Sequence, residues 1–376
     1  MNAGHLLDGD EVVTETFAIG LLRGMLDIPS PSYREQELAR YLADSMGALG
    51  FAAHVDRAGN AVGELVRGDG PTVLLLGHMD TVDGEVPVRC ENGKLYGRGA
   101  VDAKGPLAAM ICAAARAADF PGRLVVVGAV EEETPLSRGA MEVRRTLDRP
   151  DALVVGEPSG WSTVVLGYKG KLDLRYRVEV PPTQPSRPFD KAAELAARCW
   201  ATLLDLLGPE ADHGSFGRPG MTLTSVHGDL TEAEAEFSVR TPPGFDVDQL
   251  LDRLAARTDQ GTLSVVNRTP ACQVRRTDPV VRALSAGFRA LGATPGAKLK
   301  TATSDMNILA ERWAIPMATY GPGDSELDHA DDEHIDLDDY VRGIAVLGRA
   351  LAGLAGELAT ARHPAPRMRL VREEAP

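Results

Sequence analysis

The sequence lacks the features that mark membrane, secreted and nucleic-acid-binding proteins. None of its apolar runs approaches the roughly 20 residues that span a bilayer. The N-terminus, MNAGHLLDGDEVV, is acidic and has neither the basic region nor the apolar core of a signal peptide. Basic residues are in deficit, with 40 Lys and Arg against 54 Asp and Glu, for a net charge of −14. We therefore expect neither a membrane nor a nucleic acid as a partner.

Cysteine is also scarce. The chain has 4 cysteines, and none of them forms a CxxC pair. Cys112 and Cys199 lie in alanine-rich helical stretches, where thiols pack as small apolar groups. This usage predicts a reduced protein of the cytoplasm.

Apolar periodicity predicts an α/β fold. At 376 residues the chain exceeds the size at which one core keeps growing, so we expect two domains. Strands are predicted at 51–56, 61–66, 72–77, 124–130 and 152–155, and helices at 11–26, 104–118 and 138–147. A further helix is predicted up to Leu49, with Ser32 and Glu35 as its capping box. This alternation predicts a mixed, mostly parallel sheet with helices on both faces.

The middle of the chain has a different pattern. Residues 172–180 alternate apolar and polar side chains, which is typical of a half-exposed strand. The following elements read β-α-β-β-α-β, so we predict an inserted ferredoxin-like α+β domain. The predicted organisation is a catalytic domain from 1–166 and 275–361, an inserted domain at 167–274, and a flexible tail at 362–376.

His78 and Asp80 follow the apolar strand Thr72–Gly77 and are two residues apart. Positions i and i+2 of a strand share one face, so both side chains project from its carboxyl end. Open α/β sheets place their sites at this edge. Considered alone, such a pair is more often an ordinary strand end followed by a turn than a site.

Acidic residues follow other strands and loops of the predicted fold, which makes the pattern harder to dismiss. They are the run Glu131-Glu132-Glu133, Glu157, Asp102, and Asp328 beside His329. A glutamate run is usually a solvated face, and an aspartate before a helix is usually an N-cap. Buried carboxylates without partners cost several kcal/mol each, so clusters of them are held by cations or metals. Together with two histidines, this inventory predicts a dinuclear zinc site with a bridging aspartate.

These motifs resemble one enzyme family in kind and order. They are His78-Met79-Asp80, Gly97-Arg98-Gly99 with Asp102, Glu132-Glu133, Gly156-Glu157-Pro158 and His329. The chain is similar to the dinuclear-zinc amidohydrolases that include acetylornithine deacetylase, succinyl-diaminopimelate desuccinylase, aminoacylase and carboxypeptidase G. The resemblance covers nearly the whole chain and implies that the inserted domain forms a homodimer.

The resemblance also implies roles for individual residues. It places two divalent ions, zinc or alternatively cobalt, on the metal ligands His78, Asp102, Glu133, Glu157 and His329. His78 and Glu157 would hold one ion, Glu133 and His329 the other, and Asp102 would bridge them. Glu132 would be the general acid/base, and Asp80 would orient the His78 ring. The register of the glutamates can slip by one, which would make the pair Glu131-Glu132.

Longer stretches resemble one branch, the hydrolases that release lysine or ornithine from a small acidic amino-group carrier protein. Gly167-Tyr168-Lys169-Gly170 and Thr303-Ser304-Asp305-Met306-Asn307 are among them. A small acyl amino acid is the alternative substrate, as in acetylornithine or acetyllysine deacetylases. No residue is identified as substrate-binding on this basis. Basic residues of the alternating strand are candidates for contacting the carrier, namely Lys169, Lys171, Arg175 and Arg177.

One position departs from the family pattern. The family has a histidine in the inserted domain that reaches across the dimer and stabilises the oxyanion, and Gln184 stands in its place. A glutamine amide donates a hydrogen bond but carries no charge. His213 and His227 lie in the same domain and are the alternatives for that role. A catalytically impaired relative that still binds metal is therefore the opposing hypothesis.

Overall fold

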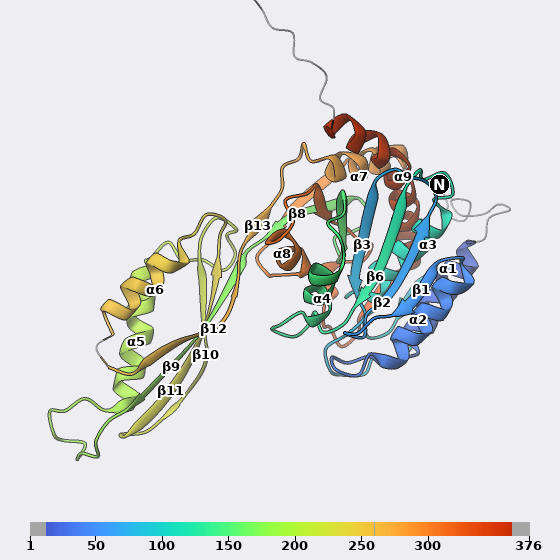
Figure 1. Cartoon of the computed structure of the whole chain (residues 1–376). Coiled ribbons are helices and arrows are strands. Elements are labelled where there is room, and N and C mark those ends of the chain that lie inside the picture. The colour runs from blue at the N-terminus through green and yellow to red at the C-terminus, as the bar shows by residue number, and fades with distance from the viewer. Residues whose placement is uncertain (1–12, 259, 363–376) are drawn as a thin grey trace, which may run out of the picture.

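The computed structural model describes residues 13–258 and 260–362, which form two lobes of unequal size (Figure 1). A nine-stranded sheet forms the large lobe, with a small three-stranded sheet beside it, and a four-stranded sheet forms the small lobe. The chain enters the small lobe between β8 (Thr163–Tyr168) and β9 (Gly170–Glu179). It returns between β12 (Thr262–Thr269) and β13 (Cys272–Gln273). Within the described ranges, no helix is both long and apolar enough to cross a membrane.

The sheet of the large lobe is mixed, as predicted. Its order is β1-β2-β6-β3-β7-β15-β8-β13, with β14 paired to β8. The central strand β3 runs parallel to β6 and β7, β1 pairs with β2 antiparallel at one edge, and β14 pairs with β8 in parallel near the other. The bounds of the strands not yet given are β1 (Ala52–Val55), β2 (Ala61–Val66), β3 (Thr72–His78), β6 (Arg123–Ala129), β7 (Ala152–Gly156), β14 (Gly296–Lys300) and β15 (Met317–Thr319).

Helices cover both faces of this sheet because its central strands are apolar on both sides. Val73 and Leu75 of β3 pack in the cluster that contains α1, α2, α3, α7 and α9. Leu74 and Leu76 point to the opposite face, in the cluster with α4 and α8. The helix bounds are α1 (Glu15–Leu26), α2 (Gln36–Ala48), α3 (Lys104–Arg116), α4 (Arg138–Thr146), α7 (Pro279–Ala290), α8 (Asp305–Ala310) and α9 (Leu337–Arg362).

The small lobe is an antiparallel sheet with two helices on one face (Figure 1). Its strand order is β10-β11-β9-β12. Alternate residues of β9, among them Leu172, Leu174 and Tyr176, pack against the helices. The remaining elements are β10 (Gly220–Gly228), β11 (Glu232–Thr241), α5 (Ala192–Leu207) and α6 (Val247–Ala256), so the chain order is β-α-β-β-α-β. The limits 167–274 remain a proposal for the inserted domain, and at their two ends they include the end of β8 and the whole of β13, which pair in the sheet of the large lobe.

A small third sheet joins two distant parts of the large lobe. It consists of β4 (Arg89–Glu91), β5 (Lys94–Tyr96) and β16 (His334–Asp336) in the order β16-β5-β4. Ile335 pairs with Leu95, which brings the segment after His329 beside the loop that begins at Gly97. The 3-10 helix η2 (Ser325–Leu327) precedes His329.

The structure differs from the sequence-based expectation in several places. The capping box is wrong: α2 begins after Glu35 without a side-chain cap, and the Ser32 hydroxyl donates to Asp80 instead. A tertiary partner has displaced the local one. Strands β8 and β14 were not predicted. β8 has no clear period-2 pattern, whereas residues 297–300 of β14 do alternate apolar and polar side chains. The predicted tail at 362–376 lies almost entirely outside the described residues.

Candidate metal centre

Three neighbouring strands bring the predicted ligands to one edge of the sheet. Strand β3 ends at His78, and β7 ends just before Glu157. Strand β6 is followed by the turn that contains Glu132 and Glu133. Since β3 runs parallel to both neighbours, the three carboxyl ends meet at the position where such sheets hold their sites.

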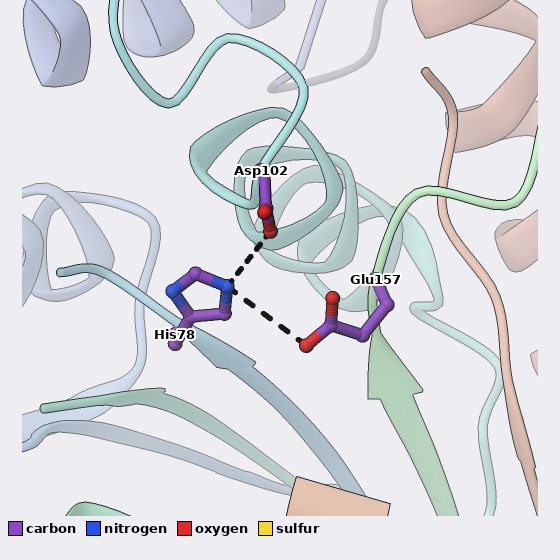
Figure 2. A group of neighbouring side chains, drawn as sticks. All are labelled: His78, Asp102 and Glu157. Carbon is purple, nitrogen blue, oxygen red and sulfur yellow. Dashed lines mark hydrogen bonds and ion pairs between the residues drawn. The ribbon is translucent and has the colours of Figure 1, made fainter. Parts of the chain in front are cut away.

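His78, Asp102 and Glu157 form the first group (Figure 2). His78 Nε2 lies 3.1 Å from Asp102 Oδ1 and 3.8 Å from Glu157 Oε1. On the other side of the ring, His78 Nδ1 lies 2.9 Å from the backbone carbonyl oxygen of Asp80. A carbonyl oxygen only accepts, so Nδ1 carries a proton and Nε2 is the nitrogen that faces the carboxylates. His78 and Glu157 are buried.

Asp102, Glu133 and His329 form the second group. His329 Nε2 lies 3.1 Å from Asp102 Oδ2 and 2.9 Å from Glu133 Oε1. Asp102 therefore belongs to both groups and directs one oxygen toward each histidine. The second group is more open, because the His329 side chain is 49% exposed.

Burial and mutual contacts shift the pKa values of these side chains. Burial raises the pKa of Glu157 to about 8, and the nearby Asp102 adds to the rise. The hydrogen bond to Asp102 raises the pKa of His329 to about 9. For Asp102, hydrogen bonds from His329 and His78 outweigh burial and lower the pKa. Burial and mutual repulsion thus oppose ionisation of Glu157, and divalent cations are what stabilise such buried carboxylate clusters in proteins.

The donor set fits two such ions. Each group offers one imidazole nitrogen and carboxylate oxygens, which are ligands that zinc and related ions accept. In each group the ligand atoms lie within 4.8 Å of one another. The sequence-predicted ligands are thus brought together in the predicted division, with Asp102 shared.

The glutamates at 131–133 have three different surroundings. Glu133 lies in the second ligand group. Glu131 turns away and pairs with Arg138 at 2.6 Å, so the geometry favours the register with Glu132 and Glu133 at the site. Glu132 lies outside both ligand groups, and burial followed by the proximity of Glu157 raises its pKa well above the usual value. It is an unligated carboxyl group beside the cluster.

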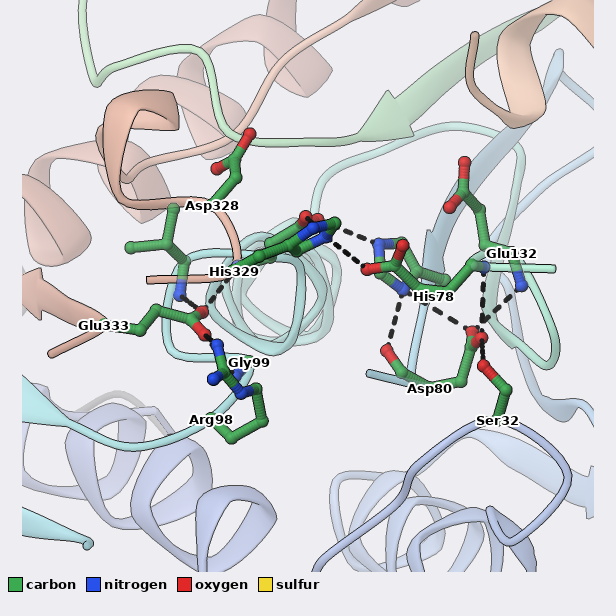
Figure 3. A network of polar contacts seen from close by, with 12 residues as sticks. Ser32, His78, Asp80, Arg98, Gly99, Glu132, Asp328, His329 and Glu333 are labelled. Atoms are coloured by element: carbon green, nitrogen blue, oxygen red, sulfur yellow. Dashed lines mark hydrogen bonds and ion pairs between the residues drawn. The ribbon is translucent and has the colours of Figure 1, made fainter. Parts of the chain in front are cut away.

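Asp80 fastens the turn that bears these glutamates (Figure 3). Its Oδ1 accepts from the backbone N–H of Glu132 at 3.0 Å. Its Oδ2 accepts from the N–H of Glu133 at 3.1 Å and from the Ser32 hydroxyl at 2.8 Å. The carboxylate lies 3.5 Å from His78 Nδ1, farther than its own backbone carbonyl. Asp80 contacts the His78 ring mainly through its main chain.

Glu333 is a site residue that the sequence motifs did not reveal. It is 1% exposed, and its carboxylate accepts four hydrogen bonds from Arg98 and the loop that ends at Asp102 (Figure 3). Gly99 fits the loop because its φ is +86° and a Cβ there would lie 2.9 Å from Thr81 Cγ2. Only the acidic character of residues 328–333 hinted at a role for this segment.

Gln184 is not brought to this cluster within one chain. The loop between β9 and α5, which contains it, lies at the end of the small lobe remote from β3 (Figure 1). Of the two alternatives, His213 bonds the carbonyl oxygen of Met221 at 2.7 Å within the small lobe, and His227 lies on β10.

The basic residues proposed for carrier contact are engaged elsewhere. Lys169 is fully buried and donates to the backbone of Asp212. The other three pair with carboxylates of the same sheet: Lys171 with Asp173, Arg175 with Glu236, and Arg177 with Glu234. The structure does not favour these residues as a free docking surface.

Comparisons with known proteins agree with this geometry. Residues 74–353 match the model of the peptidase family M20/M25/M40. The [LysW]-lysine hydrolase of Deinococcus radiodurans is 42% identical over 353 residues, covering 89% of this chain and 96% of that protein. A putative [LysW]-lysine/[LysW]-ornithine hydrolase of Thermococcus kodakarensis is 37% identical, with 90% and 92% covered. A dinuclear metal binding peptidase of Bacillus subtilis shares the fold with a TM-score of 0.65 at 16% identity, with 90% and 98% covered.

Proposed function

This chain belongs to the peptidase family M20/M25/M40 and is a hydrolase, and on that premise we propose that it releases lysine or ornithine from the carrier protein LysW. The pair of ligand groups that share Asp102, with Glu132 beside them, supports the hydrolytic chemistry, and the relatives that act on LysW conjugates support the choice of substrate. The bond broken would be the amide between a carboxyl group of the carrier and the α-amine of the amino acid.

The residues that would hold two divalent ions, zinc or alternatively cobalt, are the two groups described above. Such ions supply Lewis-acid polarisation of the amide carbonyl. The chain itself supplies the proton transfer. Glu132 takes a proton from the attacking water as the new C–O bond forms, and it delivers that proton to the leaving nitrogen as the C–N bond breaks. Its raised pKa suits a group that must both accept and donate near neutral pH.

A homodimer through the small lobe completes the proposal. Among the described residues, β10 pairs only with β11, so its other edge is free to pair with a second copy. The loop with Gln184 reaches away from its own large lobe, which suits a donor that acts in the partner's site. Its amide would then stabilise the oxyanion. All four cysteines are free thiols, in keeping with a cytoplasmic protein.

The test is a substrate panel with the purified, metal-loaded protein. It is assayed on LysW conjugates of lysine and of ornithine, beside the Nα-acetyl derivatives of both amino acids. The proposal expects release from at least one conjugate with a kcat/KM well above that for the acetyl compounds. Preference for the acetyl compounds would make the protein a small-molecule deacylase. Two bound metal ions without turnover on any substrate would make it an impaired relative.

A further inference from the structure

The buried carboxylate of Glu333 connects the loops that carry Asp102 and His329, two of the three candidate ligands of the more open group. Its Oε1 accepts from the backbone N–H groups of Val101 at 2.9 Å and of Asp102 at 3.0 Å. Its Oε2 accepts from the N–H of Gly99 at 3.0 Å and from Arg98 Nη1 at 2.9 Å. Every donor comes from the loop that ends at the shared ligand Asp102.

Glu333 also belongs to the segment that carries the other candidate ligand, His329. Glu333 follows His329 by four residues, and its carbonyl oxygen accepts from the N–H of Gly97 at 3.2 Å. Arg98 closes the connection, because its Nη1 also donates to the backbone carbonyl of Ala330 at 3.1 Å. The two loops are therefore joined by side chain, main chain and guanidinium contacts.

His329 depends on this connection because its own backbone is strained. Its φ is +62°, in the left-handed region that residues with a side chain rarely adopt. Such a conformation persists only where the surroundings hold it. The carbonyl oxygen of the next residue, Ala330, accepts a hydrogen bond from Arg98.

From these contacts we propose that Glu333 is a positioning residue for the metal centre: it sets the place of Asp102 relative to His329 and thereby the affinity for the ion at the Asp102–Glu133–His329 group. The inference rests on the proposed two-ion site. Partners of metal ligands typically change metal affinity by about 10- to 100-fold when they are altered. Glu333 acts through backbone N–H groups, so it needs both carboxylate oxygens as acceptors.

Glu333→Gln tests the proposal, since it replaces one carboxylate oxygen by an NH₂ group, which cannot accept the two hydrogen bonds that this oxygen accepts. Metal-free protein is titrated with Co²⁺ and followed by calorimetry and by cobalt absorption. We expect wild type to bind two equivalents, and Glu333→Gln to retain one while the second weakens by about 10- to 100-fold. Glu333→Asp keeps both oxygens and is expected to fall between the two.

Glu64→Gln is the matched control, because Glu64 forms a two-bond contact with Arg123 in the same lobe but touches no ligand loop. It is expected to bind cobalt like wild type. Amide hydrogen exchange should quicken at Gly99, Val101 and Asp102 in Glu333→Gln alone. This readout separates loosening of the loop from a general loss of stability.

If Glu333→Gln binds each of the two ions as tightly as wild type does, the inference is overturned while the proposed function stays intact. Fewer than two equivalents in wild type would instead overturn the two-ion site. If Glu333→Gln does not fold, Glu333→Asp decides, because the shorter side chain draws both acceptor oxygens away from the N–H groups of Gly99, Val101 and Asp102. Wild-type affinity for the second ion in that variant would equally overturn the proposal.

Discussion

The backbone N–H of Glu132 donates to Asp80 Oδ1 at 3.0 Å, so the proposed general base is held by the carboxylate two residues after the proposed ligand His78. The N–H of Glu133 donates to the other oxygen of the same carboxylate at 3.1 Å. One side chain thus fixes the proposed base and a proposed metal ligand together. Because Asp80 is fully buried, its place is defined by these donors rather than by solvent.

Asp80→Asn should lower kcat by about 10- to 100-fold and weaken metal binding, because the amide nitrogen cannot accept from one of the two backbone donors. Steady-state kinetics with a metal titration measures both effects. Ser32→Ala is the control: it removes one hydrogen bond to Asp80 but leaves the bonds from the Glu132 and Glu133 N–H groups in place, so it should cost less than Asp80→Asn. Wild-type kinetics in Asp80→Asn would contradict this role.

Glu132→Gln should reduce turnover by about 100- to 10,000-fold, the range attributed to general acid–base catalysis, with metal stoichiometry unchanged. Glu132 lies outside both ligand groups, so removing its charge leaves the donor sets complete. Glu131→Gln is the matched neighbour and should remain active, since Glu131 pairs with Arg138 away from the cluster. Metal loss in Glu132→Gln, measured by elemental analysis, would show that the register is shifted by one residue.

The ligand set could be predicted to a large extent from the sequence, for a physical reason. A histidine or glutamate at the end of an apolar parallel strand has its position fixed by the strand, as His78 and Glu157 show. Asp102 and His329 stand on loops, where periodicity gives no position, and their roles came from the family resemblance. The structure brings both to the cluster.

The partners of the ligands could not be predicted from local rules. Ser32 and Glu35 satisfy the capping pattern, yet the Ser32 hydroxyl bonds Asp80, which is 48 positions away. Glu333 bonds Asp102 across 231 positions, a relation without any local signature. The alternating basic residues of β9 had a clear pattern, but the β11 glutamates that pair with Arg175 and Arg177 became visible only in the strand register.

Gln184 should affect turnover and leave metal binding unchanged. Gln184→Ala removes the proposed oxyanion donor and should lower kcat by about 100-fold or more. Gln184→His restores a donor that carries charge when protonated and should raise kcat above wild type, since charge-assisted hydrogen bonds are stronger. Metal content and the dimer mass should stay constant in both variants. Unchanged rates in both would show that the loop at 181–188 is remote from the reacting amide.

His329 should make binding of the second ion depend on pH. The hydrogen bond to Asp102 and the charge of Glu133 raise its pKa to about 9 in the metal-free protein, so the ring is protonated at neutral pH. A metal ligand must give up that proton, and affinity at the Asp102–Glu133–His329 group should therefore rise with pH until about 9.

The contribution of His329 to the stability of the protein without metal should fall as the pH rises. A folded-state pKa above the unfolded value of about 6.5 contributes stability below that pH and loses it as pH rises toward the folded value.

The pH dependence of metal binding is measured by calorimetric titration with Co²⁺ in buffers of different ionisation enthalpy, which counts the protons released. About one proton should leave with the second ion near neutral pH. The amide of His329→Gln does not titrate, so this variant should lose the pH dependence of affinity for the second ion. A wild-type affinity for the second ion that stays constant from about pH 6.5 to 8.5 would contradict the assignment of His329 as a ligand.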